Sequence, residues 1–242
     1  MKKILLGMFL LLSVFTFSKV SAKKLQKKNN KQKDVELVFI LDRSGSMGGL
    51  ESDTIGGYNS MLSKQKNQKK GKVYVTTVLF DDEYELLHNQ MSIEEIKPIT
   101  EKEYYVRGST ALLDAIGKTI MQVKANQDKK ENKDKVLFVI ITDGLENSSK
   151  EYRKDLIKKM IEERKEKDKW EFLFLGANID AIGAAGELGI ESSRAVRYKS
   201  DKKGTAKNYD VLNKAVEEIR AGNGIKDSWK EEIEKDVKNR GN

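Results

Sequence analysis

Five oxygen-bearing side chains stand next to apolar segments, where they could bind a cation together: Asp42, Ser44, Ser46, Thr110 and Asp143. The first three follow the apolar run at residues 35–41, and the last follows a second apolar run at 136–142. Hydroxyl and carboxylate oxygens are hard ligands of the kind that Mg²⁺ takes in near-octahedral geometry. The residue types therefore predict a divalent-cation site, provided that the fold brings the five together.

The apolar runs themselves predict the sheet that would do this. Residues 35–41 and 136–142 are almost continuously apolar, as expected for central strands of a parallel sheet that is buried on both faces. Further strands are predicted at 73–80 and 171–175, with edge strands at 85–88 and 195–198. Amphipathic helices are predicted at 50–66, 111–126, 150–165, 179–188 and 205–220. This alternation predicts an α/β, doubly wound domain with helices on both faces of the sheet.

Open α/β sheets bind ligands at the carboxyl ends of their strands, beside the point where the strand order reverses. Asp42 and Asp143 directly follow the two strongest strands, so we expect them to meet at that edge. Another interpretation is that each loop is only a turn, with Thr110 as a helix N-cap. That interpretation is adequate for one loop, whereas three loops that converge at one end of a sheet favour a metal site.

The order and intervals of these motifs resemble the von Willebrand factor type A domain, of a bacterial secreted type. Three motifs carry the resemblance: Asp42-x-Ser44-x-Ser46, Thr110 in a Gly-Ser-Thr-Ala-Leu segment, and Thr142-Asp143-Gly144. The resemblance covers about residues 35–220 and finds no departure at the five expected positions. It implies a Rossmann-like, mostly parallel central sheet flanked by helices, with one short antiparallel edge strand.

The resemblance also implies a metal-ion-dependent adhesion site that holds Mg²⁺, with Mn²⁺ or Ca²⁺ as alternatives. In such a site the hydroxyls of Ser44, Ser46 and Thr110 contact the metal directly, while Asp42 and Asp143 act largely through water. Because few carboxylates contact the ion, positive charge remains for an Asp or Glu of a partner protein to neutralise. The implied ligand is therefore a protein that presents an acidic side chain.

Other polar residues near these loops have two interpretations each. Arg107, Ser109 and Asp114 could tune the metal site, but contacts at the surface are their more ordinary role. The acidic run at residues 81–83 could bind another cation, but such runs more often form a solvated loop. His88 is expected on an edge strand, without a chemical role.

The first 34 residues differ from the rest of the chain. Two lysines precede an apolar stretch at residues 4–17, and small residues end at Ala22, which predicts a secretory signal peptide cleaved after Ala22. An uncleaved anchor is the alternative, but the stretch is shorter than the roughly 20 residues that span a bilayer. The predicted order is a signal peptide at 1–22, a basic disordered linker at 23–34, a von Willebrand A domain at 35–221 and a helical extension at 222–242. We therefore expect a secreted or extracytoplasmic protein, with the bacterial cell envelope as one location.

The formal net charge of +8 belongs to the N-terminal part alone. Residues 1–34 contain nine Lys and one acid, whereas the rest of the chain contains 37 basic and 37 acidic residues. Nucleic-acid binding by the folded part is therefore not expected. The six lysines of the linker could contact an anionic envelope surface, although a solvated spacer is the simpler interpretation.

The composition also excludes several kinds of catalytic site. With no Cys and a single His, the chain cannot form thiolate zinc sites, iron–sulfur clusters or sites with several imidazoles. We expect an exported, divalent-cation-dependent protein-binding module and not an enzyme. The alternatives are a non-catalytic assembly or regulatory subunit of an envelope complex, a domain with a degenerate site, and a metal-dependent phosphohydrolase. A phosphohydrolase would need a second acid two residues after Asp42, where Ser44 stands.

Overall fold

The computed structural model describes residues 34–68, 71–177 and 179–241. All of them belong to one compact unit, Gln32–Asn242. The predicted signal peptide and all but the last residue of the predicted linker lie outside the described residues. Those two predictions therefore rest on the sequence alone.

A six-stranded sheet with the strand order β3-β2-β1-β4-β5-β6 forms the centre of this unit. The strands are β1 (Val35–Asp42), β2 (Val73–Phe80), β3 (Tyr84–Ser92), β4 (Lys135–Thr142), β5 (Glu171–Ala177) and β6 (Ala195–Tyr198). Strand β3 is antiparallel to β2, and the other neighbouring pairs are parallel. The predicted doubly wound, mostly parallel α/β sheet is confirmed.

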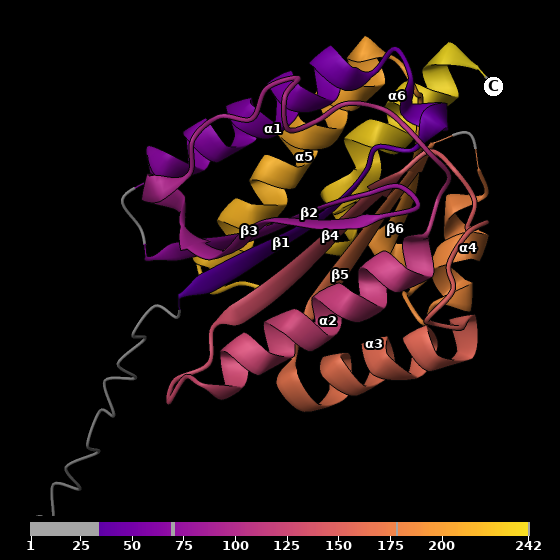
Figure 1. Cartoon of the computed structure of the whole chain (residues 1–242). Helices are drawn as coiled ribbons and strands as arrows, with labels where there is room; N and C mark the ends of the chain where they lie inside the picture. The colour runs from indigo at the N-terminus through magenta and orange to yellow at the C-terminus, as the bar shows by residue number, and fades with distance from the viewer. Residues whose placement is uncertain (1–33, 69–70, 178, 242) are drawn as a thin grey trace, which may run out of the picture. The chain divides into compact units, whose positions relative to one another are not determined.

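Helices cover both faces of the sheet (Figure 1). They are α1 (Glu51–Lys66), α2 (Leu112–Asp128), α3 (Lys154–Asp168), α4 (Ala181–Glu187), α5 (Lys202–Arg220) and α6 (Glu231–Arg240). Helices α1, α5 and α6 pack on one face, and α2, α3 and α4 pack on the other. Within the parts of the chain that the structure describes, no helix is both long and apolar enough to cross a membrane.

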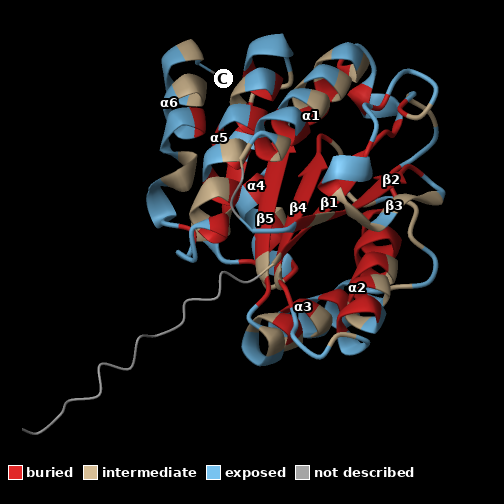
Figure 2. Cartoon of the chain, turned by 90° about the vertical axis from the view of Figure 1, so that its left-hand side faces the viewer, coloured by how far each residue is buried: buried red, intermediate tan, exposed pale blue. Residues whose placement is uncertain are grey.

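The alternation of side chains along β1 explains why its sequence is almost continuously apolar. Leu37 and Phe39 belong to the core beneath α1 and α5, whereas Val38 and Ile40 belong to the core above α2 and α3. All four are fully buried, and Figure 2 shows the buried strands between two helical layers. Glu36 is the one polar residue inside the strand, and its buried carboxylate accepts hydrogen bonds from three side chains. The next polar group along β1 is Asp42, at the end of the strand next to the site.

Several boundaries differ from the sequence prediction by a few residues, and the differences at β3 and at the last helix are the most informative. The edge strand β3 has 9 residues instead of the four predicted at 85–88, because its half-buried polar side chains hide the alternation on which strand prediction depends. The spacing of Ser228 and Glu231 is that of a capping box, which predicts that the last helix begins at Ser228, and this prediction is wrong. Ser228 lies inside a 3-10 turn, Asp227–Lys230, and α6 begins at Glu231 with no side-chain cap.

The strand order reverses between β1 and β4, which are neighbours in space although β2 and β3 separate them in sequence. The loops that follow β1 and β4 therefore leave the same edge of the sheet in opposite directions. Asp42 ends β1, and Asp143 directly follows β4. The topology places both aspartates beside the switch point.

Candidate functional site

The structure brings together the five side chains that the sequence singled out. The Ser44 Oγ lies 3.2 Å from the Ser46 Oγ, and the Thr110 Oγ1 donates a hydrogen bond of 3.0 Å to the Ser44 Oγ. The Ser46 Oγ donates to the Asp143 Oδ1 at 2.5 Å. These four side chains come from three loops and form one continuous oxygen cluster, which we call the hydroxyl cluster.

Asp42 supports this cluster from the end of β1. Its Oδ1 accepts a 2.7 Å hydrogen bond from the backbone N–H of Ser44, and its Oδ2 accepts one of 2.5 Å from the Thr142 hydroxyl. Burial raises the pKa of Asp42 to about 6, although the hydrogen bonds from Thr142 and Ser44 oppose the shift. Burial also raises the pKa of Asp143, against a hydrogen bond from Ser46. Each carboxylate therefore lies where a nearby positive charge would favour its ionised form.

The hydroxyl of Thr110 does not cap helix α2, which was the alternative to a role in binding a metal ion. Helix α2 begins at Leu112, and its N-cap residue is Ala111, whose side chain makes no capping hydrogen bond. The Thr110 hydroxyl instead points to Ser44, 66 residues earlier in the chain. The interpretation of this loop as a simple capped turn therefore fails at Thr110.

The spacing of these oxygens fits a small divalent cation. Oxygens about 2.1 Å from an octahedral Mg²⁺ lie about 3 Å apart at neighbouring corners. The two hydroxyl separations, 3.0 and 3.2 Å, are close to that value. A Cβ atom added at Gly144 would lie 3.0 Å from the Thr110 Oγ1 and 3.2 Å from the Ser46 Oγ, so a larger residue there would crowd the cluster.

The cluster is buried on one side and open on the other. Ser44, Thr110 and Asp143 are at most 5% exposed, whereas Ser46 is exposed. Next to them, the side chain of Leu145 is 63% exposed. A ligand can therefore approach from the side of Ser46, while the protein holds the oxygens from below.

The loop after Asp143 is held by residues whose roles the sequence did not indicate. Asp114 was expected to make surface contacts, but it is buried and accepts backbone hydrogen bonds from residues 150–152. Glu146 accepts a hydrogen bond from the backbone N–H of Leu113 in the first turn of α2. The Asn147 Oδ1 accepts one from the backbone N–H of Thr110. These bonds join the Asp143 loop to the start of α2.

The acidic run at residues 81–83 is not simply a solvated loop. Asp82 and Glu83 are exposed, but Asp81 is fully buried and forms ion pairs with Arg43 and Arg107. Within the described residues, no group of three or more His, Asp or Glu side chains is arranged to hold a metal ion.

Comparisons with known proteins give information about the fold. No model of a protein family and no curated protein sequence matches the chain. Among solved structures, a von Willebrand factor type A protein from Catenulispora acidiphila is similar, with 12% identity, a TM-score of 0.52 and coverage of 76% of this chain and 42% of that one. The PilB minor pilin from Streptococcus sanguinis matches with 12% identity, a TM-score of 0.54 and coverage of 76% and 61%.

A third similar structure is proximal thread matrix protein 1 from the mussel byssus, with 14% identity, a TM-score of 0.55 and coverage of 75% of this chain and 46% of that one. The chain thus spans less than two thirds of the length of each of these three proteins. At such low identity the likeness concerns the fold alone. The chain has a fold like that of the von Willebrand factor type A domain.

Proposed function

We propose that this protein is an exported, divalent-cation-dependent protein-binding module. The observation that carries the proposal is the hydroxyl cluster, in which neighbouring hydroxyls lie 3.0 and 3.2 Å apart, as at neighbouring corners of an octahedral site, and a carboxylate from a third loop contacts one of them. Ser44, Ser46 and Thr110 would hold Mg²⁺ directly, and Asp42 and Asp143 would act largely through water. Mn²⁺ and Ca²⁺ take the same kind of oxygen ligand.

The partner in this proposal is a protein that presents an Asp or Glu side chain. When bound, the ion supplies positive charge that the neutral hydroxyls of the cluster leave largely uncompensated. An acidic side chain of the partner can approach past the exposed Ser46, and the exposed Leu145 offers an apolar contact at the same rim. Binding of the partner and of the ion would therefore be coupled.

Export is proposed from the predicted signal peptide, and the fold is compatible with an extracellular role. The similar PilB minor pilin and the byssus thread matrix protein are, by their names, parts of extracellular structures. A role as a non-catalytic assembly or regulatory subunit of an envelope complex would use the same site. Phosphohydrolase activity is disfavoured because Ser44, two residues after Asp42, cannot act as a general acid near neutral pH.

Thermal unfolding of the purified protein in chelator and then in Mg²⁺, Mn²⁺ or Ca²⁺ tests the proposal. A ligand that binds only the folded state raises the unfolding temperature. Thr110→Val replaces the hydroxyl with a methyl group of similar size and should abolish the rise with metal. Thr110→Ser keeps the hydroxyl and should preserve the rise, so the pair separates loss of the oxygen from a change of packing.

Two results would count against the proposal. If no ion changes the unfolding temperature of the wild-type protein, the hydroxyl cluster has no metal role of its own. If Thr110→Val responds to metal as Thr110→Ser does, the ion binds somewhere else.

A further inference from the structure

Two of the three loops that form the hydroxyl cluster run side by side. Residues 43–47 carry Ser44 and Ser46, and residues 107–110 lead to Thr110. The backbone N–H of Arg107 donates to the carbonyl of Arg43 at 2.9 Å, and that of Gly45 donates to the carbonyl of Gly108 at 3.1 Å. Apart from these two hydrogen bonds and one 3-10 turn the loops have no regular backbone structure, so side-chain contacts contribute to how they lie against each other.

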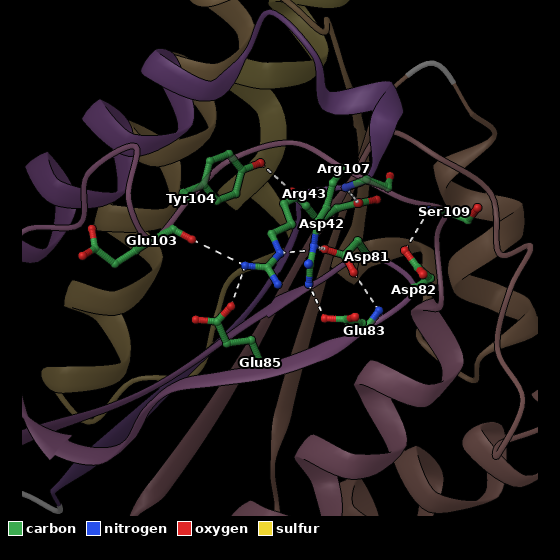
Figure 3. Close-up of polar contacts among 11 residues, drawn as sticks. Asp42, Arg43, Asp81, Asp82, Glu83, Glu85, Glu103, Tyr104, Arg107 and Ser109 are labelled. Carbon is green, nitrogen blue, oxygen red and sulfur yellow. Dashed lines mark hydrogen bonds and ion pairs between the residues drawn. The ribbon is translucent and has the colours of Figure 1, made fainter.

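Asp81 contacts both loops at once. It directly follows β2, the parallel neighbour of β1, and its Oδ2 accepts hydrogen bonds of 2.8 Å from the Nε of Arg43 and of 2.8 Å from the Nε of Arg107. Figure 3 shows the two arginines, one from each loop, converging on this carboxylate. The other oxygen accepts from the backbone N–H of Glu83 at 2.7 Å, and the Asp81 carbonyl accepts from that of Ala111 at 2.8 Å.

The burial of these groups makes the arrangement specific. Asp81 is fully buried, and the side chain of Arg43 is 1% exposed. A buried guanidinium needs an anion within hydrogen-bonding distance. Asp81 is the buried counter-ion of Arg43, because the second carboxylate that pairs with Arg43, that of Glu85, is 42% exposed. Arg43 also stands between Asp42 and Ser44, so its buried side chain anchors the segment that carries two residues of the site.

Arg107 completes the bridge from the other loop. Its side chain is 37% exposed and pairs with Glu83 as well as with Asp81. Both guanidinium groups also face the ring of Tyr105, with centroid distances of 5.2 Å for Arg43 and 5.7 Å for Arg107. The two cations can lie this close together because the shared carboxylate of Asp81 lies between them.

We infer that Asp81 is a positioning residue for the site: through Arg43 and Arg107 it holds the two loops at the separation that places the Thr110 hydroxyl against the Ser44 hydroxyl. We call this triad the Asp81 clamp. The effect of the clamp on metal binding rests on the proposed function, but its effect on how firmly the two loops are held does not. The clamp is therefore testable in the absence of any metal.

Hydrogen–deuterium exchange of the full chain in chelator is the first test. Asp81→Asn keeps the size of the side chain and an oxygen for the Glu83 N–H, but removes the charge shared by the two arginines. The amides of Gly45, Arg107 and Ala111 should exchange at least tenfold faster than in wild type, while those of β4 should change much less. Glu83→Gln removes a negative charge from the same loop without touching Arg43, and should leave all these rates within about twofold of wild type.

The clamp is overturned if Asp81→Asn leaves the loop amides as in wild type, if loop and β4 amides accelerate equally, or if Glu83→Gln has the same effect. If Asp81→Asn does not fold, Arg107→Gln replaces it, because Arg107 is partly exposed. That variant should accelerate exchange at Arg107 and Gly45, and unchanged rates there would overturn the clamp too.

Binding of Mn²⁺, followed by electron paramagnetic resonance of the free ion, gives the second readout. Asp81→Asn should weaken Mn²⁺ binding at least tenfold, and Glu83→Gln by less than threefold. If the wild-type protein binds no Mn²⁺, the proposed function fails while the exchange experiment still decides the clamp. If Asp81→Asn binds Mn²⁺ as tightly as wild type does, the clamp does not position the site.

Discussion

All three oxygens of Asp42 that can accept a hydrogen bond do so, each from a different segment of the chain. The side chain accepts from Ser44 and Thr142, and the backbone carbonyl accepts from the Tyr104 hydroxyl at 2.5 Å. A residue with this many fixed contacts is held in one orientation whether or not an ion is present. Its carboxylate is nevertheless almost completely removed from water, so its charge state depends on what else lies nearby.

The raised pKa of Asp42 predicts a pH dependence of stability in the metal-free protein. Burial moves the pKa from the usual 3.8 to about 6, so between these values the folded state binds the proton more tightly than the unfolded chain. The contribution of Asp42 to the free energy of unfolding is therefore present below pH 4 and is lost as the pH rises to about 6. For a shift of this size the loss is about 3 kcal/mol.

Chemical denaturation of metal-depleted protein between pH 4 and pH 8 measures this effect, with Asp42→Asn as the reference. The other titrating groups are common to both proteins, so the difference in unfolding free energy isolates Asp42. We expect that difference to shift in favour of Asp42→Asn as the pH rises to 6, and then to level off. A difference that does not vary with pH would show that Asp42 titrates normally in the folded state.

At the scale of elements, helices α1 and α5 pack closely against each other on one face of the sheet. Gly57 in α1 lies directly against the ring of Tyr209 in α5, and a Cβ at Gly57 would lie 2.1 Å from the Tyr209 Cδ2. Tyr209 is 4% exposed, so its ring has little room to move away. The neighbouring Gly56 has no atom within 4 Å of its hypothetical Cβ.

Alanine at these two neighbouring glycines should have opposite effects. Gly57→Ala should lower the free energy of unfolding by about 1–3 kcal/mol, because overpacking outweighs the better helix propensity of alanine. Gly56→Ala should raise it by up to about 1 kcal/mol, because the propensity gain has no steric cost. Urea denaturation of the two variants measures both, and a stabilising Gly57→Ala would show that α5 can shift away from α1.

Some elements of the fold could be predicted from the sequence, and others could not. Strands β1 and β4 are recognisable because burial on both faces makes them almost continuously apolar, and the resemblance motifs identify Asp42 and the four residues of the hydroxyl cluster. Strand β3 was too short in the prediction because an edge strand has no such pattern. The role of Asp81 was missed because local sequence shows only an acidic run, whereas its partners Arg43 and Arg107 are 38 and 26 residues away.

On the scale of the whole molecule, charge is distributed unevenly along the chain. The part from residue 35 onward contains equal numbers of basic and acidic residues, and the excess of +8 lies in residues 1–34. In the described part, many charged side chains are paired with each other, including those of the Asp81 clamp. Long-range attraction to an anionic surface should therefore come from the N-terminal segment and not from the domain.

The six lysines between residues 23 and 33 provide the sharpest test of this separation. In a chain that starts at Lys23, replacing all six with Gln keeps the segment's length and polarity but removes its charge. Each lysine near an anionic membrane contributes about 1 kcal/mol, so binding to vesicles containing anionic lipid at low salt should fall by more than tenfold. Wild-type binding should weaken similarly in 0.5 M salt, where the Debye length is only about 4 Å. The unfolding temperature and its response to Mg²⁺ should not change, because the segment precedes β1. Undiminished binding of the six-Gln variant would instead place the membrane-binding surface on the charge-balanced domain.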